Sequence, residues 1–228
     1  MPMVRYYVFG LVDSGSLAGR KFGELEVEAI SGIGLSLVVC PAPPTEKVAS
    51  SGFAALHAEL LEDLMEDHTV LPVRFGTILA SREEGLEVLE KQGPEFSRHM
   101  ARLRGKLEMG LKALWNEEEQ AVPPSTAASG REYLLARLEQ ARAHERRLDM
   151  AKAIGEGINA CFSWVPEKTT RYLVTQKLFY NSSFLIDRSE LGRFWQQVTE
   201  VKSLFPGLRF LASGPWPPYS FALAREKE

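Results

Sequence analysis

Near its end the chain reads Gly214-Pro215-Trp216-Pro217-Pro218-Tyr219-Ser220-Phe221, with three prolines among four consecutive residues. Each proline fixes the backbone φ angle near about −65° and lacks an N–H donor, so this segment cannot form the interior of a β-sheet. Residues 208–212 before it are typical of a strand, and Tyr219, Phe221 and Leu223 alternate after it. The pattern therefore predicts a rigid bend that joins two extended segments.

Two roles are open for this bend. Proline and aromatic residues in such a run form either a rigid turn at the end of a sheet or a groove that binds a partner. Trp216 and Tyr219 are large amphipathic side chains on a stiff backbone, so they lose little entropy if they lie at a contact surface. The flanking strands alternate as core strands do, which favours a structural role for both and places partner binding elsewhere on the first domain.

The composition is that of an ordinary globular protein. The 228 residues are 45% hydrophobic and 25% charged, and the length suits two domains. No apolar run is long enough for a transmembrane helix, and the N-terminal residues lack the pattern of a signal peptide, so we expect a cytoplasmic location without membrane insertion. The net charge of −3 argues against nucleic acid as a partner. Cys40 and Cys161 are far apart in sequence and are expected to be buried free thiols.

The first half alternates strands and helices, which predicts a ferredoxin-like α+β domain, a modified split βαβ sheet, over residues 1–116. Its expected elements are a central strand at 6–12, a hairpin of 25–30 with 35–40, a helix at 48–67, a strand at 70–79, a helix from Ser81, and a strand at 107–115. Ser81 with Glu84 has the spacing of a capping box.

The strand expected at 70–79 contains Leu71-Pro72-Val73-Arg74-Phe75-Gly76-Thr77. Arg74 lies in an otherwise apolar segment, where an arginine either binds an anion or packs its stem while its head reaches a carboxylate or solvent. Gly76 beside Phe75 suggests that another part of the molecule approaches closely.

Residues 117–130 combine a charged run with a proline-containing stretch of small residues, which predicts a linker. Residues 131–228 then form a smaller α+β domain. It begins with a long helix at 131–162 whose middle is expected to be solvated, like a short coiled-coil arm. Extended segments at 171–180 and 184–186, a helix at 191–204 and the last strand follow. Residues 181–183 are either a hairpin turn or a polar stretch of one long strand.

The sequence contains none of the common catalytic or cofactor-binding motifs that were sought. The chain lacks the phosphate-binding GxxxxGK[ST] and GxGxxG patterns, the nucleophile pattern GxSxG and the zinc pattern HExxH. Its histidines, at positions 57, 68, 99 and 144, are dispersed and have no nearby cysteine. We therefore expect no enzyme, no metal and no cofactor.

The two quoted segments resemble those of the gas vesicle protein family GvpL/GvpF, whose members carry a PvRFGT-like segment in the first half and a GPWPPYSF-like segment near the C-terminus. The resemblance extends over nearly the whole chain in element order, although the first domain is shorter than in many relatives and residues 177–183 are less apolar. It implies that the motif residues are structural or bind a partner: Pro72, Arg74, Phe75, Gly76, Thr77, Gly214, Pro215, Trp216, Pro217, Pro218, Tyr219 and Phe221.

The same resemblance implies two αβ domains and an accessory or minor structural protein of gas vesicle formation. Its implied partners are the shell protein GvpA and other gas vesicle accessory proteins, during nucleation or assembly. The leading hypothesis is a non-enzymatic assembly factor in the cytoplasm or at the gas vesicle. The alternative is a ferredoxin-like ligand-binding regulatory protein with Arg74 as an anion anchor, because fold alone does not decide function.

Overall fold

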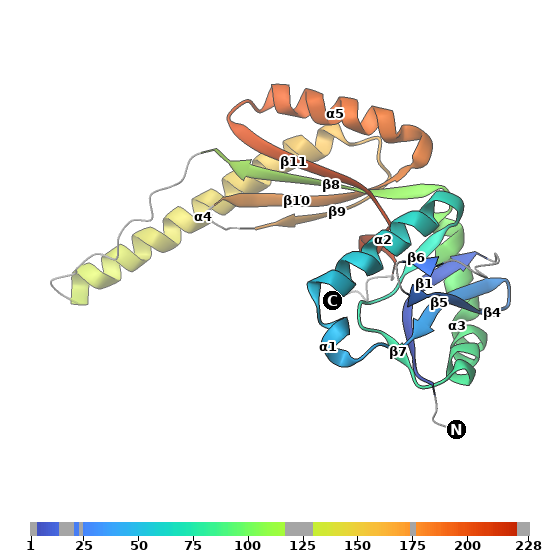
Figure 1. The fold of residues 1–228 in the computed structure, drawn as a ribbon. Helices are drawn as coiled ribbons and strands as arrows, with labels where there is room; N and C mark the ends of the chain where they lie inside the picture. The colour runs from blue at the N-terminus through green and yellow to red at the C-terminus, as the bar shows by residue number, and fades with distance from the viewer. Residues whose placement is uncertain (1–3, 14–20, 23–24, 117–129, 174–176, 223–228) are drawn as a thin grey trace. The chain divides into compact units, whose positions relative to one another are not determined.

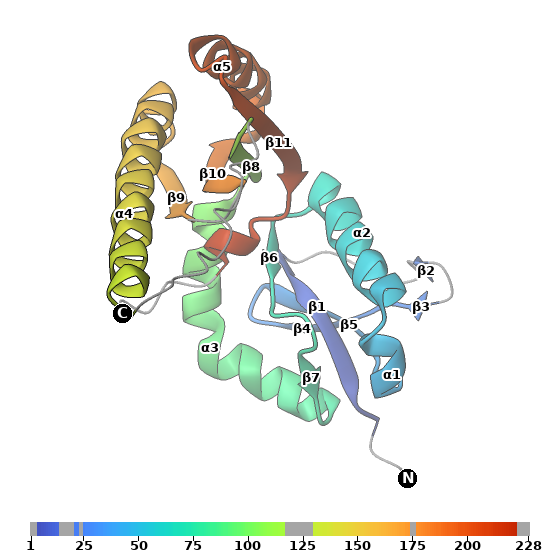
Figure 2. The ribbon, with the colours of Figure 1, turned by 90° about the vertical axis from the view of Figure 1, so that its left-hand side faces the viewer.

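The computed structural model describes residues 4–13, 21–22, 25–116, 130–173 and 177–222. The chain folds into two compact units. Unit 1 comprises Met1–Glu108 and Pro215–Glu228, and unit 2 comprises Met109–Gly214. Figure 1 labels most of the helices and strands of each unit, and Figure 2 also labels β2 and β3.

Unit 1 is built on an antiparallel sheet with the strand order β4-β5-β1-β6, in which β7 also pairs with β1. Its strands are β1 (Tyr6–Asp13), β4 (Glu28–Gly32), β5 (Leu35–Pro41), β6 (Val70–Pro72) and β7 (Ile78–Leu79). β2 (Lys21–Phe22) and β3 (Leu25–Glu26) form a separate two-stranded ladder. The helices are α1 (Thr45–Val48), α2 (Ser51–Asp67) and α3 (Arg82–Leu103).

Helices cover both faces of this sheet, with α2 on one side and α3 on the other (Figure 2). The interior of β1 and of β5 is therefore buried throughout, and both read as nearly continuous apolar runs. The prediction of β1 as a central strand and of β4 with β5 as a hairpin is confirmed.

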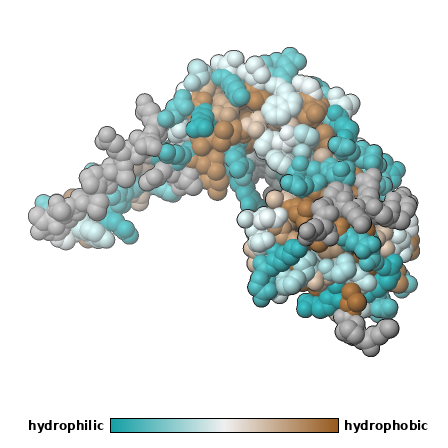
Figure 3. All heavy atoms as spheres, in the orientation of Figure 1, coloured by the Kyte–Doolittle hydropathy of each residue, from teal (hydrophilic) through white to brown (hydrophobic). Residues whose placement is uncertain are grey.

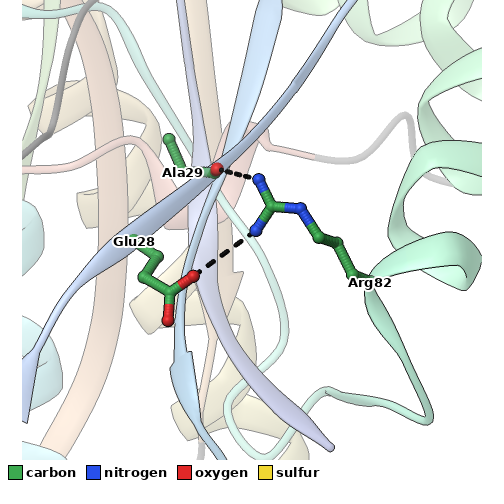
Figure 4. Close-up of polar contacts among 3 residues, drawn as sticks. All are labelled: Glu28, Ala29 and Arg82. Atoms are coloured by element: carbon green, nitrogen blue, oxygen red, sulfur yellow. Dashed lines mark hydrogen bonds and ion pairs between the residues drawn. The ribbon is translucent and has the colours of Figure 1, made fainter. Parts of the chain in front are cut away.

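The start of α3 is fixed by a cap and by contacts to the sheet. Ser81 Oγ accepts a hydrogen bond from Glu84 N at 3.3 Å, so the predicted N-terminal cap is confirmed. Arg82 reaches β4, donating to Ala29 O at 3.1 Å and to a Glu28 carboxylate oxygen at 3.4 Å (Figure 4). These contacts tie the first turn of α3 to the edge strand.

Unit 2 contains most of β8 (Lys106–Trp115), followed by α4 (Gly130–Cys161), β9 (Glu167–Tyr172), β10 (Leu178–Asp187), α5 (Leu191–Leu204) and β11 (Leu208–Trp216). The sheet order is β11-β8-β10-β9, so β10 lies between the two strands that α4 connects. A short 3-10 turn, Arg188–Glu190, precedes α5. Three aromatic rings pack together in unit 2, with centroids 4.6–5.8 Å apart. They are Phe162, directly after α4, Phe184 on β10 and Phe194 on α5.

The α+β class is confirmed, whereas the ferredoxin-like description of the first half is not. β8 was expected in the first sheet but pairs in the second, and the strand–helix–strand–strand–helix–strand order of a split βαβ unit runs from β8 to β11. Alternation identified β8 as a strand, but it carries no information about which sheet the strand joins.

The predicted boundaries, 1–116 and 131–228, also differ from the observed units. Residues 109–116 pair in the second sheet, and the described residues after Gly214 pack with unit 1. Residues 117–129 of the predicted linker lie outside the described residues, and Gly130 begins α4.

Three predictions of local structure are corrected or resolved. The strand expected at 70–79 is two short strands separated by a turn at 73–77. The segment after the prolines is a 3-10 helix at Tyr219–Phe221 rather than a strand, and Leu223 lies outside the described residues. Residues 181–183 lie inside β10, which pairs with β9 as a hairpin, so the connection falls before them. Cys40 and Cys161 are free, the first buried and the second partly buried.

Candidate partner-binding surface

The first motif forms an exposed turn. Pro72 ends β6, and Thr77 closes the turn because its backbone N–H and its hydroxyl both donate to Arg74 O, at 3.2 and 2.5 Å. Gly76 has φ +87°, a conformation that glycine adopts without strain, and no atom lies near the position of a Cβ. Open space at the Cβ position means that the left-handed conformation, and not crowding there, favours glycine at this position. Arg74, Phe75 and Gly76 are exposed.

The Phe75 ring of this turn packs against a cluster of aromatic side chains. The Tyr7 ring lies 4.9 Å from both Phe9 and Phe53, 5.8 Å from His57 and 6.1 Å from Phe75, measured between centroids. Edge-to-face contacts of this kind stabilise aromatic pairs beyond the area that they bury. Phe75 is 43% exposed although one side of its ring packs on this cluster.

The Tyr7 hydroxyl links the cluster to the turn. It lies 2.9 Å from His57 Nδ1 and accepts a hydrogen bond from Gly76 N at 3.4 Å. Burial lowers the pKa of His57 to about 4, so its ring is neutral at pH 7 and its Nδ1 shares one hydrogen bond with the Tyr7 hydroxyl. His57 Nε2 has no hydrogen-bond partner in the described structure, and its ring lies 5.3 Å from that of Phe9 and from that of Phe75.

The second motif is anchored at its end and exposed in its middle. Pro217, Pro218 and Phe221 are buried, whereas Trp216 is 39% and Tyr219 is 43% exposed. β11 continues through Trp216, so the predicted bend begins later than expected, at Pro217. The prolines therefore pin the backbone while they leave two aromatic side chains at the surface.

Two side chains of unit 1, Glu108 and Arg102, hold the 3-10 helix in place. Glu108 is 7% exposed. Its carboxylate accepts one hydrogen bond from Ser220 N at 2.7 Å and one from Ser220 Oγ at 2.6 Å. Arg102 of α3 donates to Phe221 O. Charge-assisted hydrogen bonds of this kind are about twice as strong as neutral ones.

The Tyr7 hydroxyl contacts the first motif directly, because it accepts the hydrogen bond from Gly76 N. In the second motif, burial raises the pKa of Tyr219 to about 12, and the electrostatic influence of Glu62, Tyr7 and Glu108 raises it further in that order. Phe75, Trp216 and Tyr219 are the exposed aromatic residues of the two motifs, and we call them the aromatic surface.

Over unit 1, hydrophilic side chains and smaller hydrophobic patches are interspersed on the face drawn in Figure 3. Within the described residues no group of three or more His, Cys, Asp or Glu is arranged to hold a metal ion. No described helix combines the length and apolar character needed to cross a membrane.

A second set of exposed apolar residues lies on unit 2. The first half of α4 exposes Tyr133, Leu134, Leu135 and Leu138, while Ala151, Gly155 and Ile158 of the second half are buried. The middle of this helix was predicted to be solvated, and residues 142–146 are exposed, so that prediction is confirmed.

Sequence reasoning identified the motif residues but missed their supports. Tyr7 lies on β1, His57 on α2 and Glu108 at the start of β8, so none of these three supports belongs to either motif. Glu108 occupies an ordinary polar position of an alternating strand, so no local signal distinguishes it. Only the packing of the described residues 215–222 against unit 1 shows its role.

Comparison with known proteins decides the family. The family model described as "Gas vesicle synthesis protein GvpL/GvpF" matches residues 5–223. The chain belongs to the GvpL/GvpF family. Its relatives include gas vesicle protein L of Streptomyces sp. (strain CB03234), 28% identical, with 77% of this chain and 70% of that protein covered. Gas vesicle protein F2 of Halobacterium salinarum is 25% identical, with 94% and 90% covered.

Solved structures of GvpF share the fold. The crystal structure of GvpF from Anabaena sp. PCC7120 matches with a TM-score of 0.80 at 20% identity, covering 98% of this chain and 100% of that chain. GvpF from Microcystis aeruginosa matches with a TM-score of 0.71 at 20% identity, covering 97% and 100%. Membership of the GvpL/GvpF family implies a role in gas vesicle formation.

Proposed function

We propose that this protein is a non-enzymatic accessory or minor structural protein of gas vesicle formation that binds the shell protein GvpA, and other gas vesicle assembly proteins, in the cytoplasm or at the gas vesicle. Family membership supports the process, and the exposure of Phe75, Trp216 and Tyr219 supports the binding site. The aromatic surface on unit 1 is the contact.

The observation that carries the proposal is that the second motif buries some of its side chains and exposes others. Phe221 is 3% exposed and Ser220 donates two hydrogen bonds to Glu108. Trp216 and Tyr219, in contrast, are substantially exposed to solvent. A rigid backbone that exposes aromatic side chains reduces the entropy lost on binding, and such residues are enriched among interface hot spots. Packing of the fold accounts for the buried Pro217, Pro218 and Phe221, but it does not require large aromatic side chains at the exposed positions 216 and 219.

The alternative, a ligand-binding regulatory protein anchored at Arg74, is less well supported. Arg74 is exposed on the turn rather than enclosed by other elements. An anion held only by an exposed guanidinium competes with water and salt, so this residue alone offers a weak site.

The test is complementation of a vesicle-forming host from which the gene has been deleted. Wild type should restore vesicles and retain tagged GvpA on purification. Trp216→Ala/Tyr219→Ala should retain far less GvpA with a melting temperature close to that of wild type, since both side chains are substantially exposed.

Leu134→Ser/Leu138→Ser serves as the matched control, because it removes exposed apolar area from α4 instead. Normal retention by this control is expected. Loss of GvpA by the α4 variant with full retention by the aromatic variant would move the binding site to unit 2. Normal vesicles in the deletion host would refute an essential role.

A further inference from the structure

The exposed turn of the first motif interrupts the strand pairing beside β1. Pairing with β6 ends at Pro72 and pairing with β7 begins at Ile78, so residues 73–77 leave the ladder. On β1 they lie opposite only Val8 and Phe9, and the register of β1 with β5 also shifts directly after Val8. Bulges of this kind re-aim side chains locally. The surplus residues form the exposed turn.

Two buried side chains hold the backbone of this turn. The Tyr7 hydroxyl accepts a hydrogen bond from Gly76 N at 3.4 Å and lies 2.9 Å from His57 Nδ1. Tyr7 is on β1 and His57 is on α2, and both are buried. The end of the turn is also fixed to β1, because Val8 N donates to Thr77 O at 2.9 Å. The position of Gly76 therefore depends on a buried hydroxyl that contacts α2 in turn.

Phe75, the residue before Gly76, packs on the same two side chains. The centroid of its ring lies 5.3 Å from that of His57, 6.1 Å from that of Tyr7 and 6.4 Å from that of Phe53. Phe75 is nevertheless 43% exposed. Buried groups of β1 and α2 thus set the orientation of an aromatic ring at the surface.

We propose that Tyr7 and His57 are positioning residues for partner binding: they hold Phe75 in the orientation in which it meets the partner, without touching the partner themselves. This inference rests on the proposed function, in which the partner is GvpA. A side chain that is already held in place loses less conformational entropy on binding. Affinity falls in proportion to the fraction of molecules whose turn has the competent conformation.

Tyr7→Phe tests the inference, because it keeps the ring and removes the hydroxyl. Without a partner, the Gly76 amide should exchange its proton with solvent faster than in wild type. Retention of co-expressed, tagged GvpA should fall by about tenfold, as for a turn that is competent in about a tenth of the molecules.

Tyr180→Phe is the matched control. It removes the hydroxyl of another buried tyrosine, which donates to Asn159 Oδ1 at 3.0 Å within unit 2. It should lower the melting temperature as a lost hydrogen bond does, yet leave retention of GvpA unchanged.

The Phe75→Ala background separates positioning from general destabilisation. If Tyr7 acts through Phe75, Tyr7→Phe should cause no further loss of retention once Phe75 is alanine. A merely structural role of Tyr7 would lower retention by the same factor in both backgrounds.

A second pair of variants leaves Tyr7 in place. His57→Leu removes the hydrogen-bonding partner of the Tyr7 hydroxyl and should lower retention of GvpA. His57→Gln can still form that bond, so retention should return towards that of wild type.

The outcomes separate this inference from the function on which it rests. If wild type retains no GvpA, the proposed function and the inference both fail. If wild type retains GvpA, four results overturn the inference alone. They are full retention by Tyr7→Phe or by Phe75→Ala, unchanged exchange at Gly76 in Tyr7→Phe, an equal loss in both Phe75 backgrounds, and equal retention by the two His57 variants.

Discussion

At the scale of single residues, the buried carboxylate of Glu108 organises the C-terminal motif. It accepts two hydrogen bonds from Ser220 and is nearly inaccessible to water. Glu108→Ala leaves the Ser220 donors without this acceptor, and we expect the free energy of unfolding of unit 1 to fall by about 2–3 kcal/mol, the net value of hydrogen bonds to a charged group. Urea denaturation measures the change.

The exposed Glu90 provides the control for Glu108. Glu90→Ala should change the free energy of unfolding by less than about 0.5 kcal/mol, as is usual at the surface. Equal effects of the two substitutions would show that the clamp on Ser220 contributes nothing to stability.

His57 gives unit 1 a dependence on pH. Its pKa is about 4 in the folded chain because burial disfavours the charged ring, against 6.5 for the free side chain. As pH falls from 6.5 to 4, the unfolded chain takes up a proton that the folded chain does not, so stability is full above pH 6.5 and is lost towards pH 4. The loss is about 3 kcal/mol by linkage.

His57→Gln isolates this contribution. The amide can still form a hydrogen bond with Tyr7 but does not titrate, so the difference in free energy of unfolding between pH 7 and pH 4 should shrink by about 3 kcal/mol. Urea melts at a series of pH values measure it. Identical profiles for both proteins would mean that His57 takes up its proton equally in the folded and unfolded chains.

At the scale of elements, the turn between β6 and β7 depends on one left-handed residue. Gly76 has φ +87°, so Gly76→Ala places a Cβ in an unfavourable backbone conformation and should cost about 1 kcal/mol or more. Gly52→Ala in the first turn of α2 meets open space and should instead stabilise by up to about 1 kcal/mol. Thermal denaturation compares the two, and a stabilising Gly76→Ala would contradict the left-handed turn.

At the scale of the whole molecule, unit 1 is made of two stretches of the chain. Its last described residues follow the rest of the unit after a gap of more than 100 residues in sequence. Ending the chain after Gly214 removes the buried Phe221 and the partner of Glu108. We expect the backbone amides of β1 and β5 to lose protection in hydrogen exchange, while those of β10 keep theirs, because stability is not uniform across a structure.

The full-length Trp216→Ala/Tyr219→Ala variant is the control for this truncation. It keeps Phe221 and Ser220 in place, so protection in β1 should be retained. Equal loss of protection in β1 and β10 after truncation would show that the two units unfold as a single cooperative block.

The sequence by itself determined most of the elements and the family. Apolar periodicity located α2, α4, α5, β1, β5 and β8, since it depends on which side chains avoid water, and two motifs identified the GvpL/GvpF family. It could not determine that β8 joins the second sheet, because an alternating strand fits any sheet with one buried face. Nor could it show that Phe221 is buried while Trp216 and Tyr219 are exposed. Burial there is set by residues more than 100 positions away, Glu108 and Arg102 among them, and local sequence contains no record of contacts made at that distance.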